Sequence, residues 1–169
     1  EPVIESVPHL WDYAAIRDSL LESGELITTR EAQRRVLILE NPGLDKSHRI
    51  VESLFAGLQL IMPGEIAPAH RHSPAALRFI MEGEGAYTAV GGERSYMKKG
   101  DFIITPAWAW HDHGHEGDGP MVWMDGLDIP MVALFGPLFF EMYDGDQAPD
   151  QVPPGDSLAR YGANMRPVG

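Results

Sequence analysis

The sequence of 169 residues contains no cysteine. Disulfides, thiolate zinc sites and cysteine nucleophiles are therefore excluded, and the absence of cysteine fits a reducing cytoplasm, where we expect the protein to be located. The chain also has no apolar run long enough to cross a bilayer, and its N-terminus has no basic start followed by an apolar stretch. We therefore expect neither a membrane span nor a secretion signal.

Basic residues are scarce as well. Only 13 lysines and arginines stand against 25 acidic residues, which gives a formal net charge of −12. Such a surface repels nucleic acid and anionic membranes, so we expect neither as a partner. A small anionic substrate would have to be attracted by local positive charge, from a metal ion or a few arginines. The 18 glycines and 14 prolines indicate many turns, as in an all-β domain.

Short candidate strands separated by glycine and proline turns follow one another between residues 36 and 125. An amphipathic helix is predicted before them, over residues 11–22, with Gly24 as its stop signal. Strands at this spacing are typical of a sandwich or a closed barrel. The candidate strands are 36–39, 54–62, 66–71, 77–81, 85–90, 94–97, 102–105, 111–113 and 121–125.

The last forty residues or so, counted roughly, differ in composition from the strands. Residues 131–143 form an apolar segment that we predict to be helical, with an interruption at Gly136. After Asp144 the composition shifts to Asp, Gly and Pro, which predicts a linker. A monomer rarely exposes a large apolar patch, so one group of side chains is expected to be buried against the barrel or a partner chain. This group is Phe135, Leu138, Phe139 and Phe140.

We therefore expect three segments. Residues 1–52 would be a helical and extended segment that packs on the barrel, and residues 53–143 would be the barrel with its trailing helix. Residues 144–169 would be an interdomain linker or a tail.

Histidines dominate the candidate chemistry. His70 and His72 occupy positions i and i+2, which share one face of a strand, and His111 follows a later candidate strand. Two neutral nitrogen ligands on one side of a sheet form half of a metal site. Imidazole ligands suit zinc, copper, iron and nickel.

The surroundings of these histidines resemble the two sequence motifs of the cupin superfamily. Gly64 stands six residues before His70, and residues 100–106 lead to His111. The resemblance implies an all-β fold, a double-stranded β-helix (jelly-roll) barrel, here with an N-terminal helix and a short C-terminal helical segment. Cupins of this type hold one metal ion inside the barrel. The first motif usually carries a glutamate four residues after its second histidine, but this chain has Ala76 there.

The predicted ligand set is therefore His70, His72 and His111 without a carboxylate. Three neutral imidazoles leave the full charge of a divalent metal uncompensated. A chelating dianionic substrate would neutralise that charge.

Longer motifs resemble the gentisate 1,2-dioxygenase family, which also includes salicylate and 1-hydroxy-2-naphthoate dioxygenases. The resemblance runs from about Pro8 to about Phe140. It implies a bicupin homo-oligomer with iron in the N-terminal cupin, and it identifies this chain with that half, so a second cupin domain is expected in the complete enzyme. The motifs that carry it are residues 34–37, 40–44, 63–72, 76–83, 100–106, 110–114 and 123–128.

The family implies an Fe(II) cofactor and two reactants, O₂ and a small aromatic hydroxy acid. The expected reaction is the cleavage of gentisate by O₂ to maleylpyruvate. Salicylate and 1-hydroxy-2-naphthoate remain alternative substrates. A non-catalytic metal-binding cupin module is an alternative of a different class, and a nickel- or manganese-dependent cupin is a third possibility.

The resemblance also implies residues around the substrate. It places Gln59, Arg78, His113 and Asp125 there, and it makes Arg34 a candidate contributed across a subunit contact. Arg78 would bind the substrate carboxylate as a planar fork, although an outward ion pair is the alternative, because Pro74 interrupts the strand and leaves the direction of Arg78 open.

His113 is a candidate acid or base, because it shares the face of His111 if the strand is regular. Asp125 could orient His113, so we expect these two side chains within hydrogen-bond reach, directly or through substrate or one water. Trp108 and Trp110 are expected to be packing residues.

Overall fold

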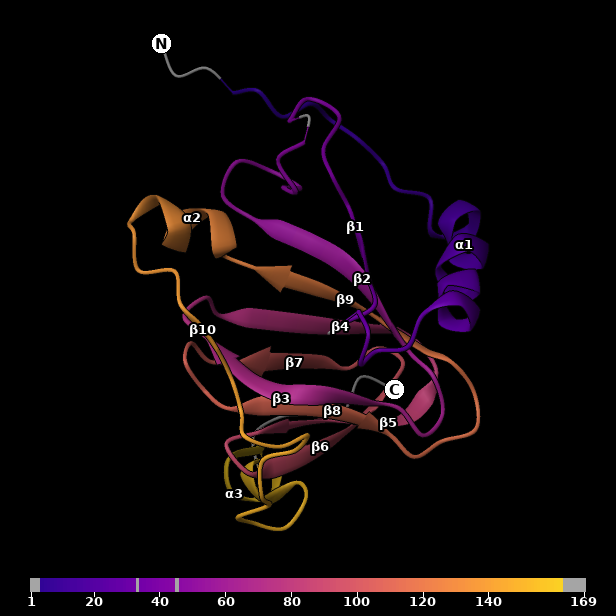
Figure 1. Ribbon diagram of the computed structural model, residues 1–169, viewed down its shortest axis with the longest axis vertical. Helices are drawn as coiled ribbons and strands as arrows, with labels where there is room; N and C mark the ends of the chain where they lie inside the picture. The colour runs from indigo at the N-terminus through magenta and orange to yellow at the C-terminus, as the bar shows by residue number, and fades with distance from the viewer. Residues whose placement is uncertain (1–3, 33, 45, 163–169) are drawn as a thin grey trace.

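Two five-stranded antiparallel sheets face each other in the computed structural model, which describes residues 4–32, 34–44 and 46–162 (Figure 1). The first sheet has the order β1-β2-β9-β4-β7 and the second the order β10-β3-β8-β5-β6. The strands are β1 (Val36–Ile38), β2 (Phe55–Ile61), β3 (Ile66–His72), β4 (Ala76–Glu82), β5 (Glu84–Val90), β6 (Glu93–Lys98), β7 (Phe102–Thr105), β8 (His111–His115), β9 (Met121–Leu127) and β10 (Phe140–Met142).

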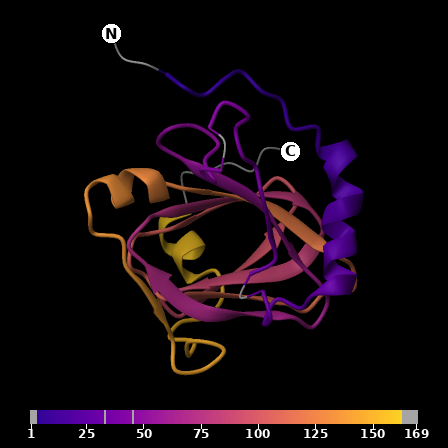
Figure 2. The ribbon, with the colours of Figure 1, turned by 45° about the horizontal axis from the view of Figure 1, so that its top comes forward.

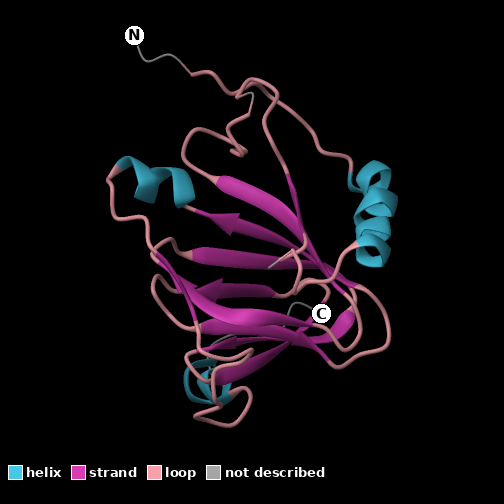
Figure 3. Ribbon diagram, in the orientation of Figure 1, coloured by secondary structure: helices cyan, strands magenta, loops and turns pink. Residues whose placement is uncertain are grey.

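Strands that are distant in sequence are neighbours in both sheets, which is the jelly-roll arrangement. In Figure 2 the strands run around an oval interior, and in Figure 3 the helices lie outside them. The structure therefore confirms the expected all-β cupin barrel with an N-terminal helix. Strand β1 pairs with β2, so the expected N-terminal segment contributes a strand to the first sheet.

The apolar core fills only part of the space between the sheets. Strand residues alternate between the interior and the outside, and one buried cluster with members from both sheets lies between them. The remaining interior positions carry polar side chains, so the barrel has an apolar part and a polar part. The members of the apolar cluster are Ile61, Ile80, Ala86, Met97, Met121 and Trp123.

Helix α1 (Tyr13–Leu26) covers the outside of the first sheet (Figure 1). The side chain of Asp12 caps it by accepting from the Ala14 amide, and Leu20 is buried against β2 residues. The helix continues past Gly24, where we expected it to stop. A side chain at Gly24 would come within 3.1 Å of Leu60, so this glycine lets the helix approach β2 closely.

The segment after β9 differs from the single helix predicted over residues 131–143. Helix α2 (Ile129–Leu134) is short, and β10 follows it and pairs with β3. The physical reason lies at Gly136, which has a φ of 91°, and at the following proline, because a left-handed residue ends a helix and proline has no amide hydrogen to continue one. The helical prediction is therefore wrong after α2.

The apolar group of this segment stays largely exposed in the chain. Phe135 is 75% exposed, Leu138 47%, Phe139 60% and Phe140 55%. The expectation that the barrel would bury this group is therefore wrong, because β10 pairs at the edge of the second sheet and leaves these side chains at the rim. Burial by a partner chain stays a prediction.

Residues 144–162 run along the second sheet and end in α3 (Asp156–Tyr161). The side-chain amide of Gln147 donates to the Tyr87 hydroxyl, and the backbone amide of Gln151 donates to the Gly92 carbonyl at 2.8 Å. This part of the expected linker therefore contacts the barrel, whereas residues 163–169 lie outside the described residues. The division of the chain into three segments stays a prediction. Within the described ranges no helix is both long enough and apolar enough to cross a membrane.

Helix α1 is joined to β4 by a cluster around Glu82. The carboxylate of Glu82 accepts hydrogen bonds from the Tyr13 hydroxyl at 2.9 Å and from Arg17 Nε at 2.8 Å. The hydrogen bond from Arg17 lowers the pKa of Glu82, while burial raises the pKa of Tyr13 to about 12. The carboxylate of Glu82 is thus hydrogen-bonded to side chains of α1 and faces away from the histidines of the interior.

We expect Glu82→Gln to destabilise the fold in a pH-dependent manner. A carboxyl group with a lowered pKa contributes stability above its unfolded pKa of about 4.3, and that contribution is lost as the pH falls through the folded pKa. The variant should therefore be less stable than the wild type by about 1 kcal/mol or less at pH 7, and the difference should shrink below pH 4 or so. Urea unfolding across this pH range measures it. The exposed Glu25→Gln on the same helix is the control, and a pH-independent difference would contradict the assignment.

Candidate metal centre

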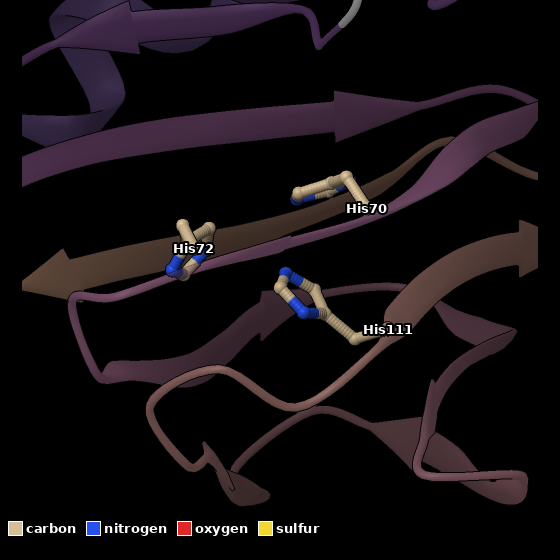
Figure 4. A group of neighbouring side chains, drawn as sticks. All are labelled: His70, His72 and His111. Carbon is tan, nitrogen blue, oxygen red and sulfur yellow. The ribbon is translucent and has the colours of Figure 1, made fainter. Parts of the chain in front are cut away.

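Three histidines converge inside the barrel (Figure 4). His70 and His72 lie two positions apart on β3, and His111 opens β8 directly opposite His70 in the antiparallel register. Each side chain is at most 6% exposed, and the three candidate ligand atoms lie within 4.8 Å of one another. The pairing of β3 with β8 thus turns two distant sequence motifs into one cluster that could hold a metal ion.

The hydrogen bonds of these histidines define which ring nitrogen is free. The Nδ1 atom of His70 lies 2.7 Å from the carbonyl oxygen of Pro68, that of His72 lies 2.8 Å from Pro74, and that of His111 lies 2.9 Å from Ala109. A carbonyl oxygen only accepts, so each Nδ1 must carry the proton and donate it. The Nε2 atom of each ring then keeps its lone pair.

All three Nε2 atoms are buried and have no hydrogen-bond partner among the described residues. Buried polar atoms without a partner are uncommon in folded proteins, and backbone carbonyls that orient histidine through Nδ1 are typical of metal sites. Burial lowers the pKa of His70 to about 3 and also lowers the pKa of His72 and His111, so the rings are neutral at pH 7. The donor set therefore fits a divalent metal ion.

Arg78 on β4 points into the barrel and is fully buried. Its Nε atom lies 3.2 Å from Oδ1 of Asp125, an ion-pair distance without hydrogen-bond alignment, and Nη1 donates to the Thr105 hydroxyl at 2.5 Å. Asp125 is directly opposite Arg78 in the register of β9, and it also accepts from the Trp123 indole at 3.1 Å. Burial raises the pKa of Asp125, whereas the charge of Arg78 opposes that rise.

His113 lies on the same face of β8 as His111 and is completely buried. Its Nδ1 atom is 3.0 Å from the Thr88 hydroxyl, which lies 3.2 Å from the sulfur of Met97. A thioether only accepts, so with the hydroxyl hydrogen on the sulfur, the Thr88 oxygen accepts from Nδ1–H of His113. The Nε2 atom of His113 has no partner among the residues that the structure describes, and burial lowers the pKa of His113 well below its ordinary value. His113 is therefore a neutral ring with a free lone pair.

Asp125 and His113 make no direct hydrogen bond in the described part of the chain. Each contacts Trp123 instead: the indole donates to Asp125, and its ring centroid lies 5.3 Å from that of His113. A contact through substrate or water stays a prediction. Gln59 on β2 is also fully buried, and neither of its amide atoms has a partner within the described part of the chain, so its polar group is available inside the barrel.

Arg34 lies just before β1, in the same chain and close to the histidines. Its Nη2 atom is buried and has no hydrogen-bond partner in the described ranges, and burial lowers the pKa of Arg34 to about 10, so the group remains cationic at neutral pH. It borders a cavity of about 460 Å³ together with His72, Leu127, Leu138 and Phe140. The positive charges of Arg34 and Arg78 face a single carboxylate, that of Asp125.

Three contributors to this site were not predicted from the sequence. The ring of Phe140 stacks on His70 with centroids 5.4 Å apart, and Thr88 and Thr105 contact His113 and Arg78. The apolar run that contains Phe140 was recognised, but as a contact surface. Strand parity alone could have placed Thr88 inside, since it occupies an interior position of β5. Thr105 offered no comparable signal.

A jelly-roll barrel with three buried histidines defines a cupin whose interior could hold a metal ion. The family model for the cupin domain matches residues 57–129. The chain is 60% identical to gentisate 1,2-dioxygenase 1 of Aquipseudomonas alcaligenes over 99% of its own length and 48% of that protein. It is 34% identical to the 5-nitrosalicylic acid 1,2-dioxygenase of a Bradyrhizobium species, over 83% of this chain and 69% of that protein.

The solved structure of the salicylate 1,2-dioxygenase from Pseudoaminobacter salicylatoxidans in adducts with gentisate is similar too. The TM-score is 0.88 at 38% identity, covering 99% of this chain and 46% of that one. The chain belongs to the gentisate 1,2-dioxygenase family. It spans about half the length of the Aquipseudomonas relative.

We expect His72→Ala to abolish metal retention, because only two of three imidazoles would remain. The loss should exceed the roughly 10–100-fold loss of affinity that follows changes in the residues supporting a ligand. The measurement is metal content per chain by mass spectrometry after anaerobic loading with Fe(II) and gel filtration. His9→Ala, an exposed histidine, is the control. A His72→Ala protein that keeps one metal per chain would exclude His72 as a ligand.

Proposed function

We propose that this chain is the metal-bearing cupin half of an Fe(II)-dependent dioxygenase that cleaves gentisate to maleylpyruvate. The observation that carries the proposal is the juxtaposition of three Nε2 atoms, which have no partner among the described residues, with two arginines near one carboxylate, that of Asp125. Arg78 is fully buried and Arg34 is half-buried. The 60% identity to a gentisate 1,2-dioxygenase supports the same reaction. The reaction adds both atoms of O₂ to gentisate and breaks the ring bond between the carboxyl-bearing carbon and the neighbouring hydroxyl-bearing carbon.

The charge balance favours an anionic, chelating substrate. A divalent ion among three neutral imidazoles, close to Arg34 and Arg78, would leave excess positive charge in a buried space. Uncompensated charge is costly in such surroundings. The carboxylate and the ionised ortho hydroxyl of a hydroxybenzoate would supply two negative charges on adjacent atoms.

His70, His72 and His111 would hold the ferrous ion, which would supply a Lewis-acidic, redox-active centre. The chain's own residues would orient the substrate. Arg78 is proposed to hold the carboxylate from inside the barrel, Arg34 to approach it from the cavity, and Gln59 to hydrogen-bond a ring substituent. Holding the ring in one orientation lowers the entropic cost of the reaction.

His113 is proposed to handle the proton of the second hydroxyl of gentisate, which lies para to the first. Its Nε2 atom has a free lone pair, because Nδ1–H donates to Thr88. Accepting that proton would make the ring a better electron donor at the carbon that oxygen attacks. Asp125 is proposed to assist through the substrate or one water.

Three other functions are alternatives to this proposal. Salicylate and 1-hydroxy-2-naphthoate fit the same carboxylate and ortho hydroxyl, but both lack the para hydroxyl that His113 would serve. A non-catalytic cupin module, or a cupin that uses nickel or manganese, would keep the histidines without the iron-dependent reaction. The identity of the bound metal and the uptake of O₂ with each acid distinguish these possibilities.

Assembly belongs to the proposal as well. We propose that the complete enzyme has a second cupin domain and forms a homo-oligomer, in which a partner chain covers the exposed group of Phe135, Leu138, Phe139 and Phe140. The length of the Aquipseudomonas relative, about twice the span matched here, supports the additional domain. The cytoplasmic location expected from the absence of cysteine stays a prediction.

We expect the complete protein, freed of metal and reloaded anaerobically with Fe(II), to consume O₂ with gentisate faster than with salicylate or 1-hydroxy-2-naphthoate. An oxygen electrode measures uptake, and absorbance follows the ring-opened product. Loading with Zn(II), which has no redox chemistry, is the control and should give no uptake. A protein that binds Fe(II) but consumes no O₂ with any of the three acids would favour the non-catalytic module.

We expect His113→Ala in the complete enzyme to lower turnover on gentisate by about 100-fold while iron content stays near normal. The effect should be much smaller on salicylate, if salicylate is turned over, because salicylate has no para hydroxyl. Iron content is measured alongside kcat for both substrates. Stoichiometric loss of iron would make His113 a ligand or a support of the fold, and equal losses of kcat on both substrates would contradict the proposed proton transfer. Asp125→Asn, which keeps the shape of the side chain, tests the assisting role in the same assay.

A further inference from the structure

The loop of residues 106–110 has a strained backbone next to the metal ligands. Trp108 has a φ of 63°, in the left-handed region that bulky residues rarely adopt. Such a conformation persists only when the surrounding structure holds it, and it is concentrated at functional sites. The loop connects β7 to β8, so it leads directly to His111.

This loop makes contacts with two of the three ligand histidines. The Ala109 carbonyl accepts the Nδ1–H of His111 at 2.9 Å, and the Trp108 amide donates to the His72 carbonyl at 2.8 Å. His70 and His72 donate Nδ1–H to carbonyls two residues away in and beside their own strand. Among the three histidines, His111 is therefore the one whose ring orientation depends on the geometry of the loop.

Arg71 holds this loop from the outer face of the second sheet. Its neighbours His70 and His72 point into the barrel, so Arg71 points outward. Its guanidinium lies 4.4 Å from the ring centroid of Trp108 and 4.5 Å from that of Trp110. Two cation–π contacts from one arginine thus fix both tryptophans of the loop.

The arginine is itself fixed by Glu141, which lies opposite it on β10. Glu141 Oε2 is 2.6 Å from Nη2 and 2.8 Å from Nε of Arg71. Phe139 contacts the edge of Trp108, and Tyr143 that of Trp110, with centroids 6.4 Å and 5.1 Å apart. One charged group therefore links β3, β10 and the loop before β8.

We propose that Arg71 is a positioning residue for the metal centre, which it serves by clamping Trp108 and Trp110 so that the Ala109 carbonyl fixes the ring of His111. This inference rests on the metal site proposed above. Lysine cannot replace the arginine fully, because its ammonium is not planar and cannot stack on two rings while pairing with a carboxylate.

Cobalt substitution tests the proposal in the complete protein. Co(II) shifts the exchangeable Nδ1–H resonance of each coordinated histidine far from the rest of the proton NMR spectrum, so the three hydrogen bonds can be followed separately. The variants are Arg71→Ala and Arg71→Lys. The matched control is Arg94→Ala, since Arg94 lies 4.4 Å over the Tyr87 ring and pairs with Glu116 and Asp150 on the same sheet, away from the loop.

The wild type should give three shifted resonances. In Arg71→Ala the resonance of His111 should exchange with solvent faster, that of His70 should be unchanged, and the dissociation constant for Co(II) should rise about tenfold. In Arg71→Lys, the exchange rate at His111 and the dissociation constant should lie between those of the wild type and Arg71→Ala. Arg94→Ala should match the wild type in both. Trp108→Gly, which adopts the left-handed backbone without strain, removes one face of the clamp and should reproduce the change at His111 even if Arg71→Ala does not fold.

Unchanged exchange at His111 and unchanged affinity in the folded Arg71 and Trp108 variants would overturn the proposal. Equal losses in Arg71→Ala and Arg94→Ala would overturn it too, because they would indicate a general loss of stability. Failure of the wild type to bind Co(II) would instead overturn the metal site itself.

Discussion

The hydrogen bond from each of the three clustered histidines to a backbone carbonyl is the constraint on which the candidate metal site depends. Because Pro68, Pro74 and Ala109 accept the Nδ1 protons, all three Nε2 lone pairs are directed away from the backbone. Two of the carbonyls belong to β3 and its end. The third belongs to the loop two residues before His111, and the same loop is tied to β3 by the hydrogen bond from the Trp108 amide to the His72 carbonyl.

The interior of the barrel is divided between apolar and polar side chains. Apolar side chains around Trp123 close one part of the space between the sheets. In the other part, Arg78 and Asp125 face each other across adjacent strands. Removing one partner of such a buried pair would leave an uncompensated charge. The additional charge of Arg34 makes this space better suited to an anion than to a neutral ligand.

The strands that carry the three histidines, β3 and β8, are supported by contacts outside the barrel as well as inside it. Strand β10 extends the second sheet beside β3, and the segment that follows it contacts Asp112 and Tyr87 from the outer face. Arg71 connects β10 to the tryptophans of the loop before β8. The inner surface of the sheet carries the histidines, while its outer surface carries the contacts that hold their strands in register.

The sequence by itself determined the fold class, most of the strands and the three candidate ligands, because alternation along a strand and the i, i+2 spacing of His70 and His72 are local properties. Only the tertiary structure decided the direction of Arg78, since Pro74 interrupts the alternation before it, and the position of Arg34 beside the cavity. It also decided that residues 140–142 form a strand and that Thr88 and Trp123 contact His113. Those outcomes depend on which strands pair, and strand pairing joins residues far apart in the sequence, where no local pattern reports it.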